Sequence, residues 1–216
     1  MKGLFITFEG TEGCGKSTQV SLLAERLRGM GLLVRTLREP GGTPIGEEIR
    51  HTLKHSHANH AMTSEAELLL MNASRAQLVR EVIRPALAAG EIVISDRFYD
   101  STIAYQGYGR ELNLATVRQV IDLAVGNTRP DITLLLHVSP EVSNARRLAR
   151  QPNLPLEIKR DRFEEADHAF FERVALGFKA VAESEPNRVR QIDASGSVEE
   201  IRKEIWSTIQ HLLAKR

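Results

Sequence analysis

Residues 10–17 read Gly-Thr-Glu-Gly-Cys-Gly-Lys-Ser and fit the phosphate-loop pattern G-x-x-x-x-G-K-[ST]. The glycines allow backbone N–H groups to turn inward around an anion, and the helix that follows directs its positive end to the same point. In such a loop Lys16 reaches the β- and γ-phosphates and Ser17 ligates Mg²⁺. We therefore predict a nucleoside triphosphate site formed by Gly10, Thr11, Glu12, Gly13, Cys14, Gly15, Lys16, Ser17 and Thr18.

A second candidate site begins at the end of the apolar run 91–95. Asp96 occupies the position expected of a carboxylate that helps to hold Mg²⁺ opposite a phosphate loop, so Ser17 and Asp96 are candidate metal ligands. Arg97 follows directly and is placed to grip a second anionic group, although an acid–Arg pair at a strand end can also be structural. Polar side chains that could complete this second site follow along the chain: Ser101, Thr102, Tyr105 and Gln106.

Two further segments could face the second site. Residues 38–43 read Arg-Glu-Pro-Gly-Gly-Thr and form a turn after the second predicted strand, at the edge where parallel sheets bind ligands. Arg75 is a polar residue on the otherwise apolar face of a predicted helix. It is either a surface residue with a buried stem or part of the wall between the two sites, and its neighbours favour the wall.

The segment 146–162 is predicted to be a mobile lid. Its central part, residues 151–160, is irregular, contains two prolines and lies between two helical stretches. Phosphoryl transfer depends mainly on positioning and charge neutralisation, so a basic lid over the γ-phosphate would supply charge and exclude water. A solvated basic surface is the alternative interpretation. The cations of this segment are Arg146, Arg147, Arg150, Lys159, Arg160 and Arg162.

Short apolar runs alternate with helical patterns along the whole chain. Strands are predicted at 4–8, 32–37, 91–95, 132–138 and 188–192, with a helix after the phosphate loop. Capping boxes at Ser64 with Glu67 and at Ser197 with Glu200 start two further helices, and Pro85 is expected to interrupt the first of them. Alternation of this kind predicts an α/β fold with a parallel sheet covered by helices on both faces. We expect a single domain over residues 1–216.

Composition excludes several classes of protein. The formal net charge is +1, from 29 Lys and Arg against 28 Asp and Glu, which gives no support for nucleic-acid binding. No apolar run approaches the ~18 residues of a membrane span. A single cysteine, Cys14, precludes an internal disulfide and is either a small residue tolerated in a tight loop or a redox-sensitive thiol. We expect a cytoplasmic protein.

Motifs spread over the whole chain resemble those of the thymidylate kinases, the bacterial dTMP kinases. The matching segments are 8–17, 38–43, Asp96-Arg97-Phe98, Ala104-Tyr105-Gln106-Gly107, Arg129-Pro130-Asp131, 161–164 and Ile192-Asp193-Ala194. The resemblance implies a P-loop NTPase fold with a five-stranded parallel sheet, a homodimer, and ATP-dependent phosphorylation of dTMP to dTDP with Mg²⁺.

The resemblance also implies roles for individual residues. Arg75 would hydrogen-bond thymine and Arg97 the dTMP phosphate, while Glu12 and Tyr105 would line the sugar. Thr102 and Gln106 would contact the base, with Arg50 and Glu39 completing the acceptor side. Because the loop has Thr11 and Glu12 where some relatives carry an Arg, a lid cation such as Arg150 should assist the transfer. The candidate catalytic residues are thus Lys16, Arg97, Arg150 and Glu12, and the candidate dTMP-binding residues are Glu39, Arg50, Met71, Arg75, Arg97, Ser101, Thr102, Tyr105 and Gln106.

Two other functions are compatible with a phosphate loop in this fold. A nucleotide or deoxynucleoside kinase of the same fold is the nearer one, and a nucleoside kinase would need a base to deprotonate a hydroxyl. A GTPase-like switch is the other, since residues 193–196 spell D-x-x-G. The sequence contains no N-K-x-D to read guanine, which disfavours the switch.

One departure from the family generates a test. Four residues before Arg75 the family usually has a Phe that stacks on thymine, and this chain has Met71. Since an aromatic partner adds about 0.5–1.5 kcal/mol over burial alone, Met71→Phe should lower the KM for dTMP about two- to tenfold. Steady-state kinetics with varied dTMP checks this, with the KM for ATP as the internal control. An unchanged or raised KM for dTMP contradicts it.

Overall fold

A computed structural model describes residues 3–139, 142–143, 146 and 167–214. Its centre is a five-stranded parallel sheet in the order β2-β3-β1-β4-β5. The predicted strands are therefore confirmed, with bounds moved by one or two residues. The strands are β1 (Leu4–Glu9), β2 (Val34–Arg38), β3 (Ile92–Asp96), β4 (Ile132–His137) and β5 (Val189–Asp193).

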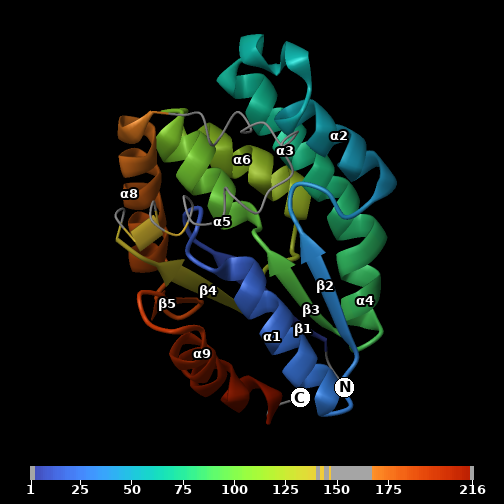
Figure 1. The fold of residues 1–216 in the computed structure, drawn as a ribbon. Coiled ribbons are helices and arrows are strands. Elements are labelled where there is room, and N and C mark those ends of the chain that lie inside the picture. The colour runs from blue at the N-terminus through green and yellow to red at the C-terminus, as the bar shows by residue number, and fades with distance from the viewer. Residues whose placement is uncertain (1–2, 140–141, 144–145, 147–166, 215–216) are drawn as a thin grey trace.

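Helices cover both faces of the sheet (Figure 1). On one face lie α1 (Lys16–Gly29) and α9 (Val198–Leu213), and their apolar side chains share a core with Leu4, Ile6 and Phe8 of β1. Phe5 belongs to a second core on the opposite face. The helices that build this second core include α3 (Ser64–Leu78), α5 (Tyr99–Thr102), α6 (Leu114–Val125) and α8 (His168–Ser184).

Strand alternation also decides where polar side chains of β1 lie. Because successive side chains point to opposite faces, Thr7 and Glu9 share the face of Phe5. Both are fully buried, as is Thr133 of β4, whose hydroxyl lies 2.7 Å from that of Thr7. The predicted strands read as apolar, yet the central strands β1 and β4 carry buried polar side chains on this face.

The strand register brings the functional segments to one edge. Phe8 of β1 pairs with Asp96 of β3, and Arg38 of β2 pairs with Asp96 from the other side. The phosphate loop after β1, the turn after β2 and the Asp96-Arg97 segment after β3 therefore emerge next to one another. This is the edge at which open parallel sheets bind ligands.

Two predictions about the helix that begins near residue 64 are wrong. Its N-cap is Thr63, whose hydroxyl accepts from the N–H of Ala66, so Ser64 and Glu67 form no capping box. Pro85 does not end the helix either, because a π-helical turn, Val79–Ile83, leads into α4 (Arg84–Ala88) and places the proline in a first turn. A first-turn proline lacks only an N–H that has no intrahelical partner anyway. The capping box of Ser197 and Glu200 is confirmed.

Three remaining segments complete the fold. The turn after β2 is followed by α2 (Pro44–Lys54) and a short 3-10 helix (His57–Ala61), and α5 continues into a π-helical segment, Ile103–Gly109. Over the described residues, no helix combines the length and the apolar character needed to cross a membrane.

Candidate active site

The phosphate loop lies between β1 and α1, as predicted. Gly10, Gly13 and Gly15 all have positive φ, and a Cβ on Gly10 would come within 2.2 Å of the Leu136 carbonyl oxygen. Only glycine fits that position. Lys16 is buried and its Nζ donates to the carbonyl oxygens of Gly10 at 3.0 Å and Thr11 at 2.8 Å. The ammonium group thus lies inside the loop, where a phosphate would enter.

Cys14 is fully buried in the core beneath this loop. Its Sγ lies 3.6 Å from Nζ of Lys16, and a Cβ on Gly10 would come within 3.0 Å of it. Burial of this kind is typical of a small packing residue and favours that interpretation of Cys14 over a reactive thiol.

The two candidate metal ligands meet across the loop. The Ser17 hydroxyl, in the first turn of α1, donates to Oδ2 of Asp96 at the end of β3, at 2.5 Å. One hydroxyl and one carboxylate are a donor set that suits Mg²⁺, which keeps waters and substrate phosphates as its other ligands. Among the described residues, no cluster of three or more His, Cys, Asp or Glu side chains forms an alternative metal centre.

Arg97 joins the phosphate loop to the second site. Its backbone is left-handed, with φ 73°, an uncommon state for a residue with a side chain. Nη1 donates to the Gly10 carbonyl oxygen and to the Ser101 hydroxyl, both at 3.0 Å. Nη2 donates to Glu12 Oε1 at 2.6 Å and to the Tyr105 hydroxyl at 3.2 Å. One guanidinium therefore contacts both predicted sites.

Glu12 is held in its ionised form by this arginine. Burial opposes ionisation, but the nearby charges of Arg97 and Lys16 outweigh it and lower the pKa of Glu12 to about 2. Arg97 gains in turn, because the charges around it hold its own pKa well above the ordinary value against the cost of burial. The pair stays charged throughout the physiological pH range.

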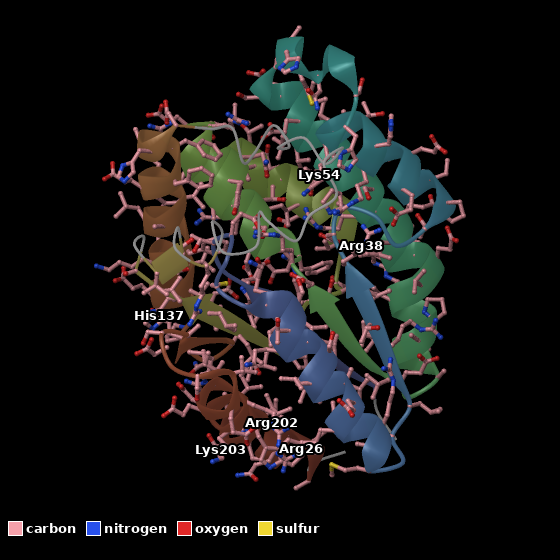
Figure 2. The ribbon with its side chains drawn as sticks, viewed as in Figure 1. Arg26, Arg38, Lys54, His137, Arg202 and Lys203 are labelled. Carbon is pink, nitrogen blue, oxygen red and sulfur yellow. The ribbon has the colours of Figure 1, made fainter. Side chains whose placement is uncertain are left out.

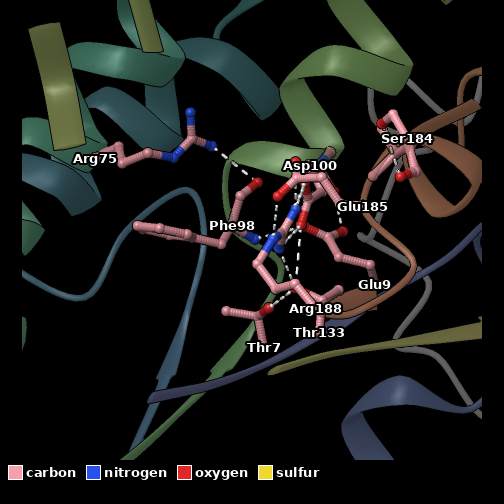
Figure 3. Close-up of polar contacts among 11 residues, drawn as sticks. Thr7, Glu9, Arg75, Phe98, Asp100, Thr133, Ser184, Glu185 and Arg188 are labelled. Carbon is pink, nitrogen blue, oxygen red and sulfur yellow. Dashed lines mark hydrogen bonds and ion pairs between the residues drawn. The ribbon is translucent and has the colours of Figure 1, made fainter. Parts of the chain in front are cut away.

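A buried carboxylate that sequence reasoning missed holds the Arg97 segment in place. Glu9 Oε1 accepts the N–H group of Phe98 at 2.8 Å (Figure 3). It also accepts the N–H group of Ser101 at 3.1 Å, and Oε2 accepts the Ser101 hydroxyl at 2.5 Å. Burial, together with the nearby charge of Asp100, raises the pKa of Glu9 to about 7, although Arg97 opposes the shift. The signal for Glu9 in the sequence is its place in the motif of residues 8–17.

Asp100 anchors the other end of the same segment. It is fully buried, and Arg188 at the start of β5 donates to both of its carboxylate oxygens at 2.8 Å (Figure 3). Arg188 also donates to Thr133 Oγ1 at 2.6 Å. The Asp96–Thr102 segment is thus tied to three strands through buried polar contacts.

A pocket open to solvent lies beside Arg97. Residues predicted from the sequence form most of its lining: Glu12, Glu39, Met71, Arg75, Arg97, Ser101, Thr102, Tyr105 and Gln106. Pro40 and Lys54 also line it and were not predicted. Figure 2 places Lys54 on α2. It lies one helical turn beyond Arg50, and this i, i+4 spacing could have placed Lys54 on the same helix face as Arg50.

Arg75 is part of the pocket wall, and every nitrogen of its guanidinium already has a protein partner. Nε and Nη2 face Glu39 Oε2 at 2.8 and 2.7 Å in a buried ion pair. Nη1 donates to Asn72 and Thr102 at 2.9 Å each, and Nη2 donates to the Phe98 carbonyl oxygen at 3.2 Å. Burial raises the pKa of Glu39, although the Arg75 charge opposes the shift. A direct contact between Arg75 and a base must share or replace one of these partners.

Two other predicted groups are not among the pocket lining. Arg50 donates to the Pro40 carbonyl oxygen at 2.7 Å, just behind the wall that Pro40 forms. Arg146, at the start of the predicted lid, donates to the carbonyl oxygen of Ala194 at 2.7 Å after β5. Arg150 and the remainder of the lid, residues 147–162, lie outside the described residues.

Known proteins resemble the chain over nearly its full length. A family model described as thymidylate kinase matches residues 8–205. The thymidylate kinase of Synechococcus sp. (strain JA-3-3Ab) is 49% identical over 96% of this chain and 95% of that protein. The thymidylate kinase of Chlorobaculum parvum is 47% identical over 97% and 96%. The crystal structure of thymidylate kinase from Ehrlichia chaffeensis superposes with a TM-score of 0.78 at 33% identity, covering 97% of this chain and 99% of that one.

The raised pKa of Glu9 predicts a pH-dependent stability. Because the folded-state value of about 7 exceeds the ordinary 4.5, the folded protein binds the proton more tightly, and stability falls as pH rises between these values. Between pH 4 and pH 8 the wild-type free energy of unfolding should therefore fall by about 3 kcal/mol more than that of Glu9→Gln. Urea unfolding of both proteins measures the difference. Parallel pH profiles would show that Glu9 titrates normally.

Proposed function

The chain belongs to the thymidylate kinase family and is an ATP-dependent dTMP kinase, and on this premise we propose which of its residues carry out the transfer. The enzyme moves the γ-phosphoryl group of ATP to the phosphate of dTMP and so forms dTDP. The observation that carries the assignment is the position of Arg97, whose guanidinium contacts Gly10 and Glu12 of the phosphate loop and Ser101 and Tyr105 of the pocket.

Residues 10–18 form the ATP side of this proposal. The loop N–H groups and the N-terminal end of α1 bind the phosphates, since both present positive partial charge to an anion. Lys16 exchanges the carbonyl oxygens of Gly10 and Thr11 for phosphate oxygens when ATP enters. Its charge then offsets the negative charge of the leaving ADP.

Ser17 and Asp96 would hold the Mg²⁺ ion. Their contact at 2.5 Å supports this, because one ion can accept both oxygens at once. Held there, the ion would supply positive charge that neutralises the phosphates of ATP. The short Ser17–Asp96 hydrogen bond keeps both oxygens at the mouth of the loop.

The pocket beside Arg97 is assigned to dTMP. Arg97 grips its phosphate, while Glu12 and Tyr105 lie at the sugar. Met71, Arg75, Thr102 and Gln106 form the base end, together with Glu39, which fixes Arg75. Ser101 and Arg50 act from behind, Ser101 through its contact with Arg97 and Arg50 through Pro40.

No general base is required in this mechanism. The second pKa of a phosphate monoester is near 6, so the accepting oxygen of dTMP is already largely ionised at neutral pH. The protein therefore has to bring two anions together and neutralise them, and Arg97 and Lys16 supply positive charge for this purpose. Because of the sequence resemblance, we propose Arg150 as a third cation. The same chemistry disfavours a nucleoside kinase, whose hydroxyl acceptor must lose a proton.

We also propose that the enzyme acts as a homodimer. Adjacent helices α3 and α6 each present a large exposed leucine, Leu69 with 58% and Leu123 with 78% of its surface exposed. Apolar groups on packed neighbouring helices suit a self-complementary contact between two copies. The wider proposal is one kinase domain over residues 1–216, with its lid around 146–162, working in the cytoplasm where ATP is available.

Substitution of Arg97 tests the acceptor assignment. Arg97→Met should lower kcat/KM for dTMP by about 10²–10⁴, because charge-assisted contacts to the accepting phosphate of dTMP are lost in the transition state. A coupled assay of ADP release measures this, with dUMP, dCMP and thymidine as alternative acceptors. Arg35→Met, which removes an ion pair with Glu91 at 2.9 Å on the outer strand β2, is the matched control and should stay near wild type. A loss below threefold for Arg97→Met contradicts the assignment.

The dimer proposal predicts the effect of a charge on the shared face. Leu69→Glu and Leu123→Glu should each shift the mass in solution from twice 24.1 kDa towards 24.1 kDa, since a carboxylate buried between two copies lacks a partner. Light scattering coupled to size-exclusion chromatography gives the mass. Leu33→Glu, at a site 71% exposed beside β2, serves as the control. A wild-type monomer, or dimers for both variants, would refute the proposed interface.

A further inference from the structure

Glu67 is a fully buried carboxylate beside the base end of the pocket. It lies on α3, one helical turn before Met71 and two before Arg75, both of which line the pocket. Its Oε1 accepts from Gln106 Nε2 at 2.8 Å and from Arg110 Nε at 3.2 Å, and its Oε2 pairs with Arg110 Nη2 at 3.1 Å. The mechanism above does not use this group.

Two segments with the same spacing face each other here. Glu67 and Arg75 lie eight residues apart on α3, and Thr102 and Arg110 lie eight apart on the opposing segment. Glu67 contacts Arg110, whereas Arg75 contacts Thr102, so the segments run antiparallel across the base end. The Glu67–Arg110 contact at one end of this pair therefore helps to fix the side chains at the other end, where Arg75 and Thr102 line the pocket.

The contact with Glu67 decides which amide atom Gln106 offers to the pocket. A carboxylate paired with Arg110 can only accept hydrogen bonds, so the amide atom that faces it must be the NH₂ group. The amide oxygen lies on the other branch and is left for the pocket that Gln106 lines. In the reverse orientation the Gln106 amide oxygen would face the Glu67 carboxylate. Two buried hydrogen-bond acceptors would then meet, which would weaken ligand binding several-fold.

The remaining polar groups of the base end have the opposite character. Arg75 is a cation, and its Nη1 donates to the Thr102 hydroxyl oxygen at 2.9 Å. Because that oxygen accepts from Arg75, the Thr102 hydroxyl hydrogen is left to donate elsewhere. The base end thus presents a donor at Thr102 and an acceptor at Gln106, while the N–H groups of Arg75 are held by protein partners.

We propose that Glu67 is a specificity-determining residue, which fixes the Gln106 amide so that its oxygen reads the N3–H of thymine and rejects cytosine. The inference rests on the dTMP site proposed above. Thymine carries an acceptor at O4 and a donor at N3, which match the Thr102 donor and the Gln106 acceptor of the base end. Cytosine carries a donor amino group at C4 and an acceptor at N3, so both positions are mismatched. Glu67 acts through Gln106 and is a positioning residue.

Glu67→Gln tests this role with the least change of shape. A neutral amide at position 67 can accept or donate, so Gln106 is free to turn and offer its NH₂ group to N3 of cytosine. The ratio of kcat/KM for dTMP to that for dCMP should fall about tenfold or more, through a higher KM for dTMP rather than a lower kcat. A ratio within twofold of wild type overturns the proposal.

Arg110→Lys provides the matched control. It keeps a cation beside the Glu67 carboxylate, which still accepts from Gln106, so the ratio of dTMP to dCMP should stay within twofold of wild type. If Arg110→Lys lowers the ratio as far as Glu67→Gln does, the geometry of the ion pair sets the selectivity, and the proposal fails. The double variant E67Q/R110M removes both charges together and keeps the test available if an unpaired Arg110 impairs folding.

Gln106→Ala separates this inference from the site assignment. If it leaves the KM for dTMP and the selectivity unchanged, Gln106 does not contact the base and the proposed site is wrong at that position. If Gln106→Ala lowers the ratio and Glu67→Gln does not, the site is right and the role of Glu67 is wrong. In a Gln106→Ala background, Glu67→Gln should change the ratio no further, as expected for two residues that act as one unit.

Discussion

Two carboxylates buried beneath the carboxyl edge of the sheet set the position of everything at the site. Moving a charge out of water costs several kcal/mol unless hydrogen bonds and opposite charges replace the solvent. Glu9 meets this need with the N–H groups of Phe98 and Ser101, and Asp100 meets it with both arms of Arg188. These partners hold the Asp96–Thr102 segment in place, because a displacement would leave a buried carboxyl group without its hydrogen-bond partners.

The orientation of Arg97 follows from that restriction. A left-handed backbone is unfavourable for arginine, and it persists here because the residues on both sides are held by β3 and by Glu9. The guanidinium is then aimed at the interface between the phosphate loop and the pocket, where Glu12 balances its charge before any substrate arrives. In the proposed site, the dianionic phosphate of dTMP would compete with this carboxylate for the cation. The cation is already in position there, so little side-chain rearrangement would be needed to bind the acceptor.

The sequence predicted which edge of the sheet carries the functional segments and most of the residues that line the pocket. Glycine spacing and strand-end residues such as Asp96 indicate local geometry directly. The sequence did not reveal the buried polar side chains of the central strands. Alternation along β1 shows that Glu9 faces one side of the sheet, but not that helix α5 covers it there. Glu67 was interpreted as part of a capping box, since S-x-x-E is a local pattern, whereas its real partners, Gln106 and Arg110, lie about forty residues away. Long-range pairing of this kind has no signature in a single sequence.

The two ends of the active site are built on different principles as a consequence. At the ATP end a glycine-rich loop binds phosphate through backbone groups, which requires little of the neighbouring side chains. At the proposed base end, recognition would depend on contacts between α3 and the segment after β3, where Arg75 and Glu67 are both buried and paired. Side chains held on packed helices keep their geometry more accurately than side chains on loops. On this proposal, discrimination among bases is coupled to the packing of α3 against that segment, so a substitution that loosens the packing should change acceptor choice before it changes phosphate binding.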